Sequence, residues 1–304
     1  MNTFFTFLIR FGVTALLVLP TIGSAGEMLN QSLAVEKNGV IYIDFPRGHI
    51  KVVGWDKAEV LVQGELDDTS KQLTFTNQQE KTLIKLDTEE KKYWGDASEL
   101  TVFMPKTSLL RFKGIDTGFD VSKLTSDIEG KTISGDLTVS KSTGKITLSV
   151  VSGDVNIRQS SGLVKIQSVS GMVDFSGDFE QVLIKSMSGD VKADISGADK
   201  LALKSVSGDL KVTGLVKNNA QIKLTTVNGD ISYRVDNGLN AKCELTSQFG
   251  GDIDNQLTTD LPTEASLHKK TLSFISGQGA GAITMNTVTG SITIKKMEDD
   301  NLTQ

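Results

Sequence analysis

Apolar and polar residues alternate along most of this chain. In GDLTVSKSTGKITLSVVS, which begins at Gly135, apolar side chains occupy the third and fifth positions of each nine-residue half. A period of two residues is typical of strands with one dry face and one wet face. Residues 27–115 show the same alternation without a strict period and without helical periodicity. The pattern therefore predicts an all-β chain.

The 18-residue unit recurs, and four of its eight turns read Ser-Gly-Asp. The first three units begin at Gly135, Gly153 and Gly171. Later units, which lengthen toward the C-terminus, begin at Gly189, Gly208, Gly229, Gly251 and Gly290. Repeats of this size that lengthen at one place are typical of a solenoid whose insertions are loops. We therefore predict a parallel β-helix, or β-solenoid, with coils of 18 to 22 residues marked by S-G-D turns.

Stacked coils place like residues in columns. The apolar pairs of each unit, such as Val155/Ile157 and Val164/Ile166, recur along the chain. A further apolar column stands directly before the turn and comprises Val151, Val169, Met187, Val206, Val227, Phe249 and Val288. We expect all these columns to form the core, each side chain stacking on its equivalent one coil along. Eight turns at the usual strand spacing predict a core roughly 40 Å long.

The turn residues also recur in columns. Glycine accepts positive φ, and Ser and Asp bond nearby backbone groups in tight bends. We expect Asp154, Asp190, Asp209 and Asp230 each to bond backbone in its own corner. Calcium is the alternative, because nonapeptide calcium-binding solenoids also stack Gly and Asp at turns. Their G-G-x-G-x-D spacing is absent and Asp follows glycine once per unit, so no metal site is predicted.

The N-terminus has the features of a cleaved signal peptide, residues 1–25. Arg10 precedes an apolar stretch, and small residues at Gly23-Ser24-Ala25 suit a signal peptidase. The stretch is shorter than the ~20 apolar residues that span a bilayer. We therefore expect a periplasmic or extracellular protein with no transmembrane segment after cleavage.

The rest of the chain divides into three segments. An array needs a cover on its first coil, so residues 26–115 are predicted to be a β-rich N-terminal cap or irregular early coils. Within them, the charged stretch 87–96 is predicted to be a solvated loop or a ligand-contacting tip. The repeat covers residues 116–296, with a distorted or inserted coil at about 255–274. A charged tail, 297–304, follows and is expected to shield the edge of the last strand.

The charged and reactive residues do not form a recognisable site. The net charge is −5, or −6 without Arg10, which argues against nucleic-acid binding. His49 and His268 lie far apart in the sequence, and Arg158 and Arg234 lie four coils apart. No nucleophile elbow, His/Cys metal cluster or phosphate-binding loop is present, so no catalytic, cofactor-binding or metal-binding residue is predicted. The lone Cys243 is predicted to be a small buried hydrophobe.

Two further motifs point to a family. The sequence FPRGHIKVVGWD at residues 45–56, LTVFMPK at residues 100–106 and the following S-G-D turns resemble the bacterial putative-adhesin family of β-strand-repeat proteins. The resemblance covers nearly the whole mature chain. It implies an extracytoplasmic right-handed β-solenoid without established catalytic residues.

These observations favour a non-enzymatic cell-envelope protein that presents polar sheet faces for adhesin-like binding or scaffolding. Its expected partner is an envelope protein or a polysaccharide, and a monomer is expected. A polysaccharide-active enzyme on a parallel β-helix is one alternative, and it would gather two or more carboxylates with a basic partner in one groove. A self-assembling envelope filament is the other.

Overall fold

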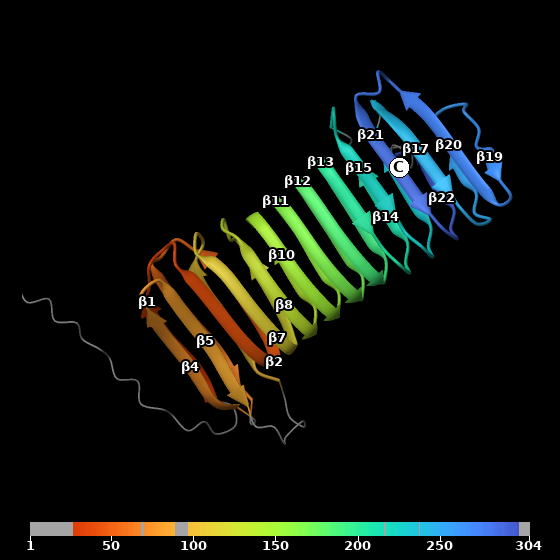
Figure 1. Cartoon of the computed structure of the whole chain (residues 1–304). Helices are drawn as coiled ribbons and strands as arrows, with labels where there is room; N and C mark the ends of the chain where they lie inside the picture. The colour runs from red at the N-terminus through yellow and green to blue at the C-terminus, as the bar shows by residue number, and fades with distance from the viewer. Residues whose placement is uncertain (1–26, 68–69, 89–96, 216, 237, 298–304) are drawn as a thin grey trace, which may run out of the picture.

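The computed structural model describes residues 27–67, 70–88, 97–215, 217–236 and 238–297. Within these ranges every regular element is a strand, and the strands wind into a long array of coils (Figure 1). The predicted all-β solenoid is confirmed. The predicted signal peptide and most of the predicted charged loop and tail lie outside the described residues.

The middle of the array consists of parallel strands, each paired with its equivalent one coil along. Ile166, for example, pairs with Leu148 of the preceding coil and Ile184 of the next. The strands of this part are β8 (Ile128–Ser134), β9 (Leu137–Ser140), β10 (Thr143–Ser152), β11 (Val155–Ser170), β12 (Val173–Ser188), β13 (Val191–Lys204), β14 (Leu210–Gly214), β15 (Gln221–Thr225) and β16 (Ile231–Val235). The second half of each unit forms the face turned toward the viewer in Figure 1, the front face, and the first half forms the opposite back face.

The core lies between these two faces and is built from stacked apolar columns. No side chain of the central front-face column is more than 2% exposed: Ile146, Val164, Val182, Leu201, Ile222, Ile283 and Cys243. In the matching back-face column, from Leu137 and Val155 to Ile292, no side chain is more than 1% exposed, and Ile253 at its end is 5% exposed. Because each side chain is covered by its neighbours one coil away, burial depends on the array.

The N-terminal segment joins the same faces but departs from chain order. Its strands are β1 (Glu27–Ala34), β2 (Val40–Trp55), β3 (Glu59–Leu66), β4 (Ser70–Gln78), β5 (Lys81–Thr88), β6 (Glu99–Pro105) and β7 (Leu109–Ser122). β2 forms a coil of its own, which pairs in parallel with β7 on one side and with β5 and β6 on the other. β4 and β3 then pair antiparallel with β5 and β6, and β1 pairs antiparallel with β3. Antiparallel strands therefore cover this end.

The C-terminal end repeats this arrangement in reverse. Its strands are β17 (Ala241–Ser247), β18 (Ile253–Asn255), β19 (Thr263–Ser266), β20 (Lys269–Ser276), β21 (Gly281–Thr287) and β22 (Ile292–Lys296). β21 lies between β15 and β17, and β22 lies between β16 and β18. β20 and β19 add antiparallel strands outside β17.

Two expectations about this end are wrong. The coils do not all stack in sequence order, because the last two strands are inserted inside the preceding coil. The strand before the charged tail is not an edge strand either, since β22 has a parallel neighbour on each side. The tail therefore has no open edge of β22 to shield.

The Ser-Gly-Asp corners stack closely enough to require glycine. Gly153 has a φ of 136°, and a Cβ there would overlap the carbonyl oxygen of Gly135 one coil back. The aspartates link successive corners: Oδ1 of Asp136 accepts the backbone N–H of Asp154 at 2.8 Å, and Oδ1 of Asp154 accepts that of Met172 at 2.7 Å. The prediction that each aspartate bonds its own corner is therefore wrong, because stacking brings the next corner's N–H within reach.

Candidate interaction surfaces

The front face carries an excess of positive charge. Its outward side chains fall in three columns with ten basic residues and three acidic ones. Arg111 pairs with Glu129 at 3.1 Å and Lys242 with Glu244 at 2.8 Å, while Lys113 pairs with a carboxylate of β2. The other seven are exposed and form no ion pair within the described residues: Lys131, Lys145, Lys165, Lys185, Lys200, Lys204 and Lys223.

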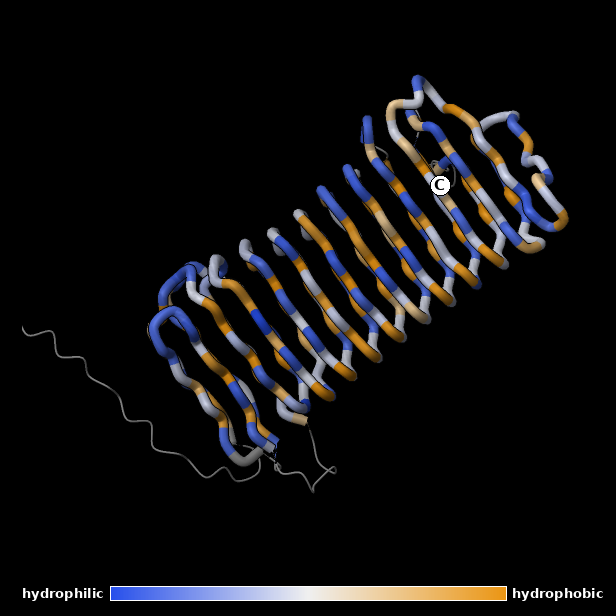
Figure 2. The backbone as a smooth tube through the Cα atoms, viewed as in Figure 1, coloured by the Kyte–Doolittle hydropathy of each residue, from blue (hydrophilic) through white to orange (hydrophobic). Residues whose placement is uncertain are grey.

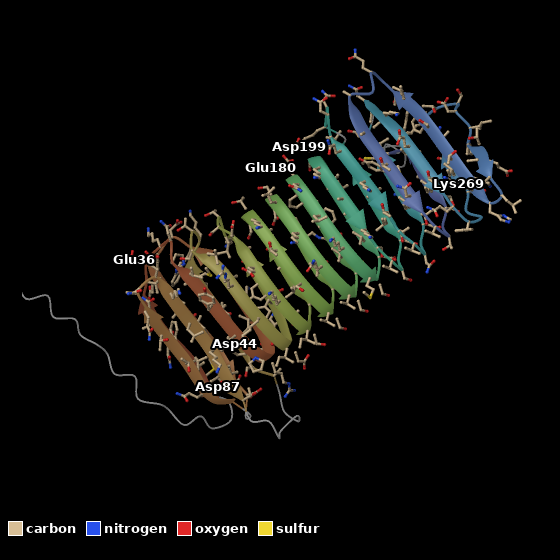
Figure 3. All side chains as sticks on the ribbon, viewed as in Figure 1. Glu36, Asp44, Asp87, Glu180, Asp199 and Lys269 are labelled. Carbon is tan, nitrogen blue, oxygen red and sulfur yellow. The ribbon has the colours of Figure 1, made fainter. Side chains whose placement is uncertain are left out.

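These lysines form a row along the solenoid. Lys165, Lys185, Lys204 and Lys223 belong to four successive coils, which lie about 4.8 Å apart. Two acidic side chains of these coils, Glu180 and Asp199, lie at the upper edge of the face (Figure 3), and Asp190 and Asp209 lie beyond the corner at the other edge. A net negative protein therefore presents one positive face.

The back face is mixed in charge and more fully paired. The guanidinium of Arg158 donates two hydrogen bonds to the carboxylate of Asp174, at 2.9 and 2.6 Å, and these bonds raise the pKa of Arg158. Lys211 lies within 3.7 Å of Asp190 and 3.3 Å of Asp209. The two faces therefore differ in their ion pairs. Arg158 and Lys211 of the back face have carboxylate partners, whereas most basic side chains on the front face have none within the described residues.

The apolar column before the turn, which begins at Val151 and was predicted to lie in the core, is exposed instead, and Ile115 and Ile133 extend it toward the N-terminus. We call the whole column the apolar ridge; it comprises Ile115, Ile133, Val151, Val169, Met187, Val206, Val227, Val288 and Phe249. Exposed fractions run from 42% at Val169 to 62% at Phe249, and Val227 and Val288 are half-buried. Figure 2 shows apolar segments at the lower edge, where successive front-face strands end.

The strand parity explains the error. Leu148 and Val150 point inward, so Val151 points outward as the chain leaves the front face. The next residues turn the corner, so no second layer covers it. Counting alternation through to the corner would have placed this column outside.

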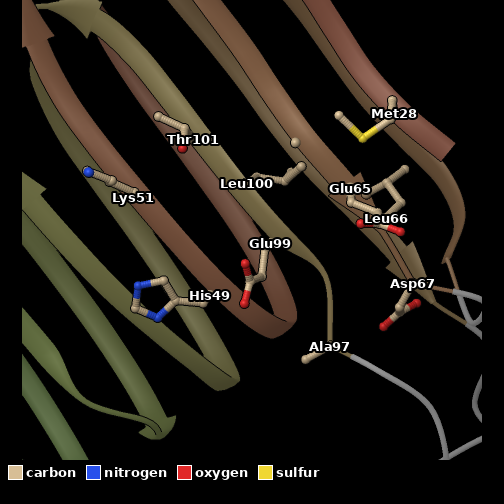
Figure 4. Close-up of a pocket in the computed structure, with 11 residues that line it drawn as sticks. Met28, His49, Lys51, Glu65, Leu66, Asp67, Ala97, Glu99, Leu100 and Thr101 are labelled. Atoms are coloured by element: carbon tan, nitrogen blue, oxygen red, sulfur yellow. The ribbon is translucent and has the colours of Figure 1, made fainter. Parts of the chain in front are cut away.

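A groove of about 710 Å³ lies at the N-terminal end, between β2, β3 and β6 (Figure 4). It is lined by His49, Lys51, Glu65 and Glu99 among others, and the two glutamates face each other across the β3–β6 pair. The His49 Nε2 atom lies 3.0 Å from Oδ2 of Asp120. Sequence analysis missed this grouping because its residues come from separate strands that only the non-sequential order brings together.

The groove residues remain accessible to solvent. His49 and Asp120 have exposed fractions of 49% and 47%, so their pairing contributes at most about 1 kcal/mol. Among the residues that the structure describes, no group of three or more His, Cys, Asp or Glu side chains could hold a metal ion. The groove can offer carboxylates and an imidazole to a polar ligand, but it shows no pre-formed nucleophile.

The remaining candidate residues are dispersed. Arg234 is exposed on the back face away from Arg158, and His268 lies in the turn between β19 and β20. Cys243 is buried, as predicted, and burial raises the pKa of its thiol to about 12. None of the described residues forms a helix long and apolar enough to cross a membrane.

Comparison with known proteins identifies the family. No curated protein matches the chain. Similar crystal structures include a putative adhesin from Bacteroides fragilis NCTC 9343, 14% identical over 89% of this chain and 97% of that chain, with a TM-score of 0.42. A putative lipid binding protein from Parabacteroides distasonis ATCC 8503 is 12% identical over 90% of this chain and 98% of that chain, with a TM-score of 0.45. These similarities carry no functional information for this chain.

The family match itself is extensive. It spans residues 33–295, from within β1 to the end of the last strand, and so covers the cap and the repeat together. The resemblance noted in the sequence is confirmed, and the chain belongs to the Toastrack DUF4097 family.

Proposed function

We propose that this protein is a non-enzymatic, adhesin-like binding protein of the cell envelope that holds an acidic polysaccharide against its front face. The row of seven exposed lysines without ion-pair partners in the described residues carries the proposal. The lysines have fixed spacing because the parallel array holds their strands. A polymer that carries one negative charge per sugar can follow such a row.

The strength of this binding depends on the number of contacts. One exposed lysine–carboxylate contact contributes less than about 1 kcal/mol. Contacts along one polymer are linked, because the first contact raises the effective concentration of the next. Several contacts together therefore bind the polymer much more tightly than one. Exposed charges are screened by salt, so the affinity should fall steeply as ionic strength rises.

The test is binding of a polyuronate, with neutral dextran as the comparison, measured by calorimetry at two salt concentrations. Substitution of Lys145, Lys165 and Lys223 by Gln should weaken polyuronate binding at least tenfold. The matched control replaces Lys192, Arg234 and Lys295 by Gln; these lie on the back face outside the groove, and the control should change binding less than twofold. Equal losses in both variants would show that net charge alone governs binding.

An envelope location is part of this proposal. The predicted signal peptide should be removed near Ala25, and the mature chain should be recovered outside the cytosol. Fractionation of the native host with N-terminal sequencing checks both points. Recovery of the unprocessed chain in the cytosol would contradict the location.

The groove between β2, β3 and β6 supports a second candidate, a polysaccharide-active enzyme. It gathers Glu65 and Glu99 with His49, as that alternative requires. Sugar release from a polyuronate that disappears in Glu99→Gln would support the enzyme. Binding without any release, unchanged by Glu99→Gln, supports the non-enzymatic role.

A further inference from the structure

We propose that the apolar ridge is the interface of a parallel, side-by-side homodimer, with its two-fold axis along the solenoid. The apolar side chains of the ridge take no part in the polysaccharide-binding proposal, but the lysine column beside them, with Lys131, Lys185 and Lys204, is shared by both proposals. This proposal replaces the monomer expected from the sequence, which had assigned the ridge to the core. The occupant of the ridge is a second copy of this chain.

The size of the ridge suits a reversible dimer. Nine coils at the usual spacing make it roughly 38 Å long. The contact strip runs from the lysine column on one side of the ridge to the aspartates beyond the corner on the other. It is about 16 Å wide, because five residues at strand spacing span that distance. The strip could bury roughly 600 Å² on each partner, which is at the lower end for specific complexes.

Charge on either side of the ridge determines the orientation. The lysine column that includes Lys131 precedes the ridge by two residues, and the aspartate column that includes Asp136 follows it by three. A two-fold axis along the solenoid sets the lysine side of one copy against the aspartate side of the other. A two-fold axis across the solenoid would instead set lysine against lysine. Only the parallel arrangement is complementary, and it is isologous as in most homodimers.

The register also fits, because the parallel dimer sets each coil against the same coil of its partner. Three coils carry a lysine on one side of the ridge and an aspartate on the other. The pairs are Lys131/Asp136, Lys185/Asp190 and Lys204/Asp209. The coil of Val169 has neither charge, with glutamine on one side and methionine on the other. Three coils thus carry both charges, whereas the coils of Val151, Val227 and Phe249 carry the aspartate without a lysine, and Lys113 has Gly118 at the aspartate position.

The Lys131/Asp136 pair offers the cleanest contact. Lys211 already lies near Asp190 and Asp209 within its own chain. Asp136 uses Oδ1 to accept the Asp154 N–H, and no ion pair involves Asp136 or Lys131 within the described residues. Its second carboxylate oxygen is therefore available to the partner's lysine. An anionic membrane fits the ridge less well, because the aspartates would approach the negative surface.

Oligomeric state is the first test. Sedimentation equilibrium of the full chain should show a concentration-dependent monomer–dimer equilibrium. Replacing Val151, Val169 and Met187 by Ser should weaken dimerisation at least tenfold without changing the melting temperature, because all three are exposed. The control replaces Leu261, Leu267 and Ile275, which are equally apolar and more exposed but lie at the C-terminal end, and should leave dimerisation unchanged.

Cross-linking tests the orientation without disturbing the fold. In the parallel dimer, Val151→Cys and Val206→Cys should each form a disulfide with the same residue of the partner, since a disulfide needs Cβ atoms about 3.5–4.5 Å apart. Cys243 is buried and does not compete. A transverse two-fold axis pairs different coils and would leave both variants uncross-linked.

Charge exchange tests the matching. Lys131→Asp should weaken the dimer about tenfold, and Lys131→Asp with Asp136→Lys should restore it, provided that circular dichroism shows both variants folded. Three outcomes would overturn the proposal: a monomer at every concentration, no cross-link at either cysteine, or a monomer that binds anionic vesicles through the ridge.

Discussion

The middle of the solenoid and its two ends differ in how chain order relates to spatial order. From β8 to β16, each strand lies beside its equivalent in the next coil along the chain. At the ends, β2 lies inside the coil formed by β5 and β6, and β22 lies inside β18. β2, which forms the first coil in the sequence, and β22, the last strand, are therefore interior strands.

This difference shows how an array can resist fraying. A repeat protein is held by nearest-neighbour contacts, so a terminal repeat with one neighbour opens most easily. Here, release of β22 from the end breaks the ladders to both β16 and β18. The outermost strands β1, β4 and β19 are antiparallel to their neighbours, so they do not repeat the parallel edge that would template another copy. Within the described residues, the short strand β18 is the exception, because its partner β22 is parallel.

The largest effect is expected in the middle, from Ile166→Asp. Ile166 is fully buried between Leu148 and Ile184. An unpaired buried carboxylate should reduce the free energy of unfolding by about 4 kcal/mol or more. Urea denaturation measures this loss. Lys165→Asp, on the wet face one residue away, should cost less than about 0.5 kcal/mol, and a comparable loss would contradict the strand register.

The ends should differ according to spatial order rather than chain order. Ile292 is fully buried between Ile231 and Ile253, whereas Ile253 lies outside it in β18 and is 5% exposed. Truncating a buried isoleucine to alanine costs about 2–5 kcal/mol. We expect the loss of unfolding free energy to be near the upper limit for Ile292→Ala and near the lower limit for Ile253→Ala. Urea denaturation measures both losses. The reverse order would mean that β22 does not stabilise the end.

The corner aspartates should contribute less than the core. Asp154→Ala removes the acceptor for the Met172 N–H and should cost about 1 kcal/mol. Asp154→Asn keeps an oxygen acceptor and should be close to neutral. Because the carboxylates already bind backbone, calcium chelation should leave Tm unchanged, measured by calorimetry. A calcium-dependent rise in Tm would show that ions bridge the corners.

The smallest effect at neutral pH concerns Cys243 in β17. Burial raises the pKa of Cys243 to about 12 in the folded state, from 9.0 for a thiol in water. The folded state then binds more protons, so stability is complete below pH 9 and falls as pH rises from about 9 to about 12. Burial also raises the pKa of Tyr233, so Cys243→Ala should remove only part of this decline. Measurement of Tm as a function of pH, in the wild-type chain and in Cys243→Ala, checks this decline.

Cys243 also reports how tightly the end is held. Val182→Cys, in the Cys243→Ala background, places a thiol in the same core column but in the middle of the array. If the inserted strands secure the end, thiol labelling of the native protein should be similarly slow at both positions. Labelling at least tenfold faster at Cys243 would show that the end opens independently.

The sequence by itself determined the repeat, the parallel stacking and most of the core. Alternation set which residues of β11 and β12 face inward, and recurrence of glycine marked each corner. Period two follows from strand geometry, and the corner glycines from Gly135 to Gly208 have positive φ, which glycine adopts readily. The family resemblance followed from the same local motifs and was confirmed.

Only the tertiary structure decided which strands became neighbours at the ends and which face of the corner met solvent. An apolar strand can stack on any equivalent strand, so the pattern of β22 fits a place beside β16 as well as one beyond β18. For the same reason, the sequence did not predict the groove around His49. It also did not show that no other element covers the apolar side chain of Val151. Alternation specifies a side of the strand, whereas burial requires another element to cover that side.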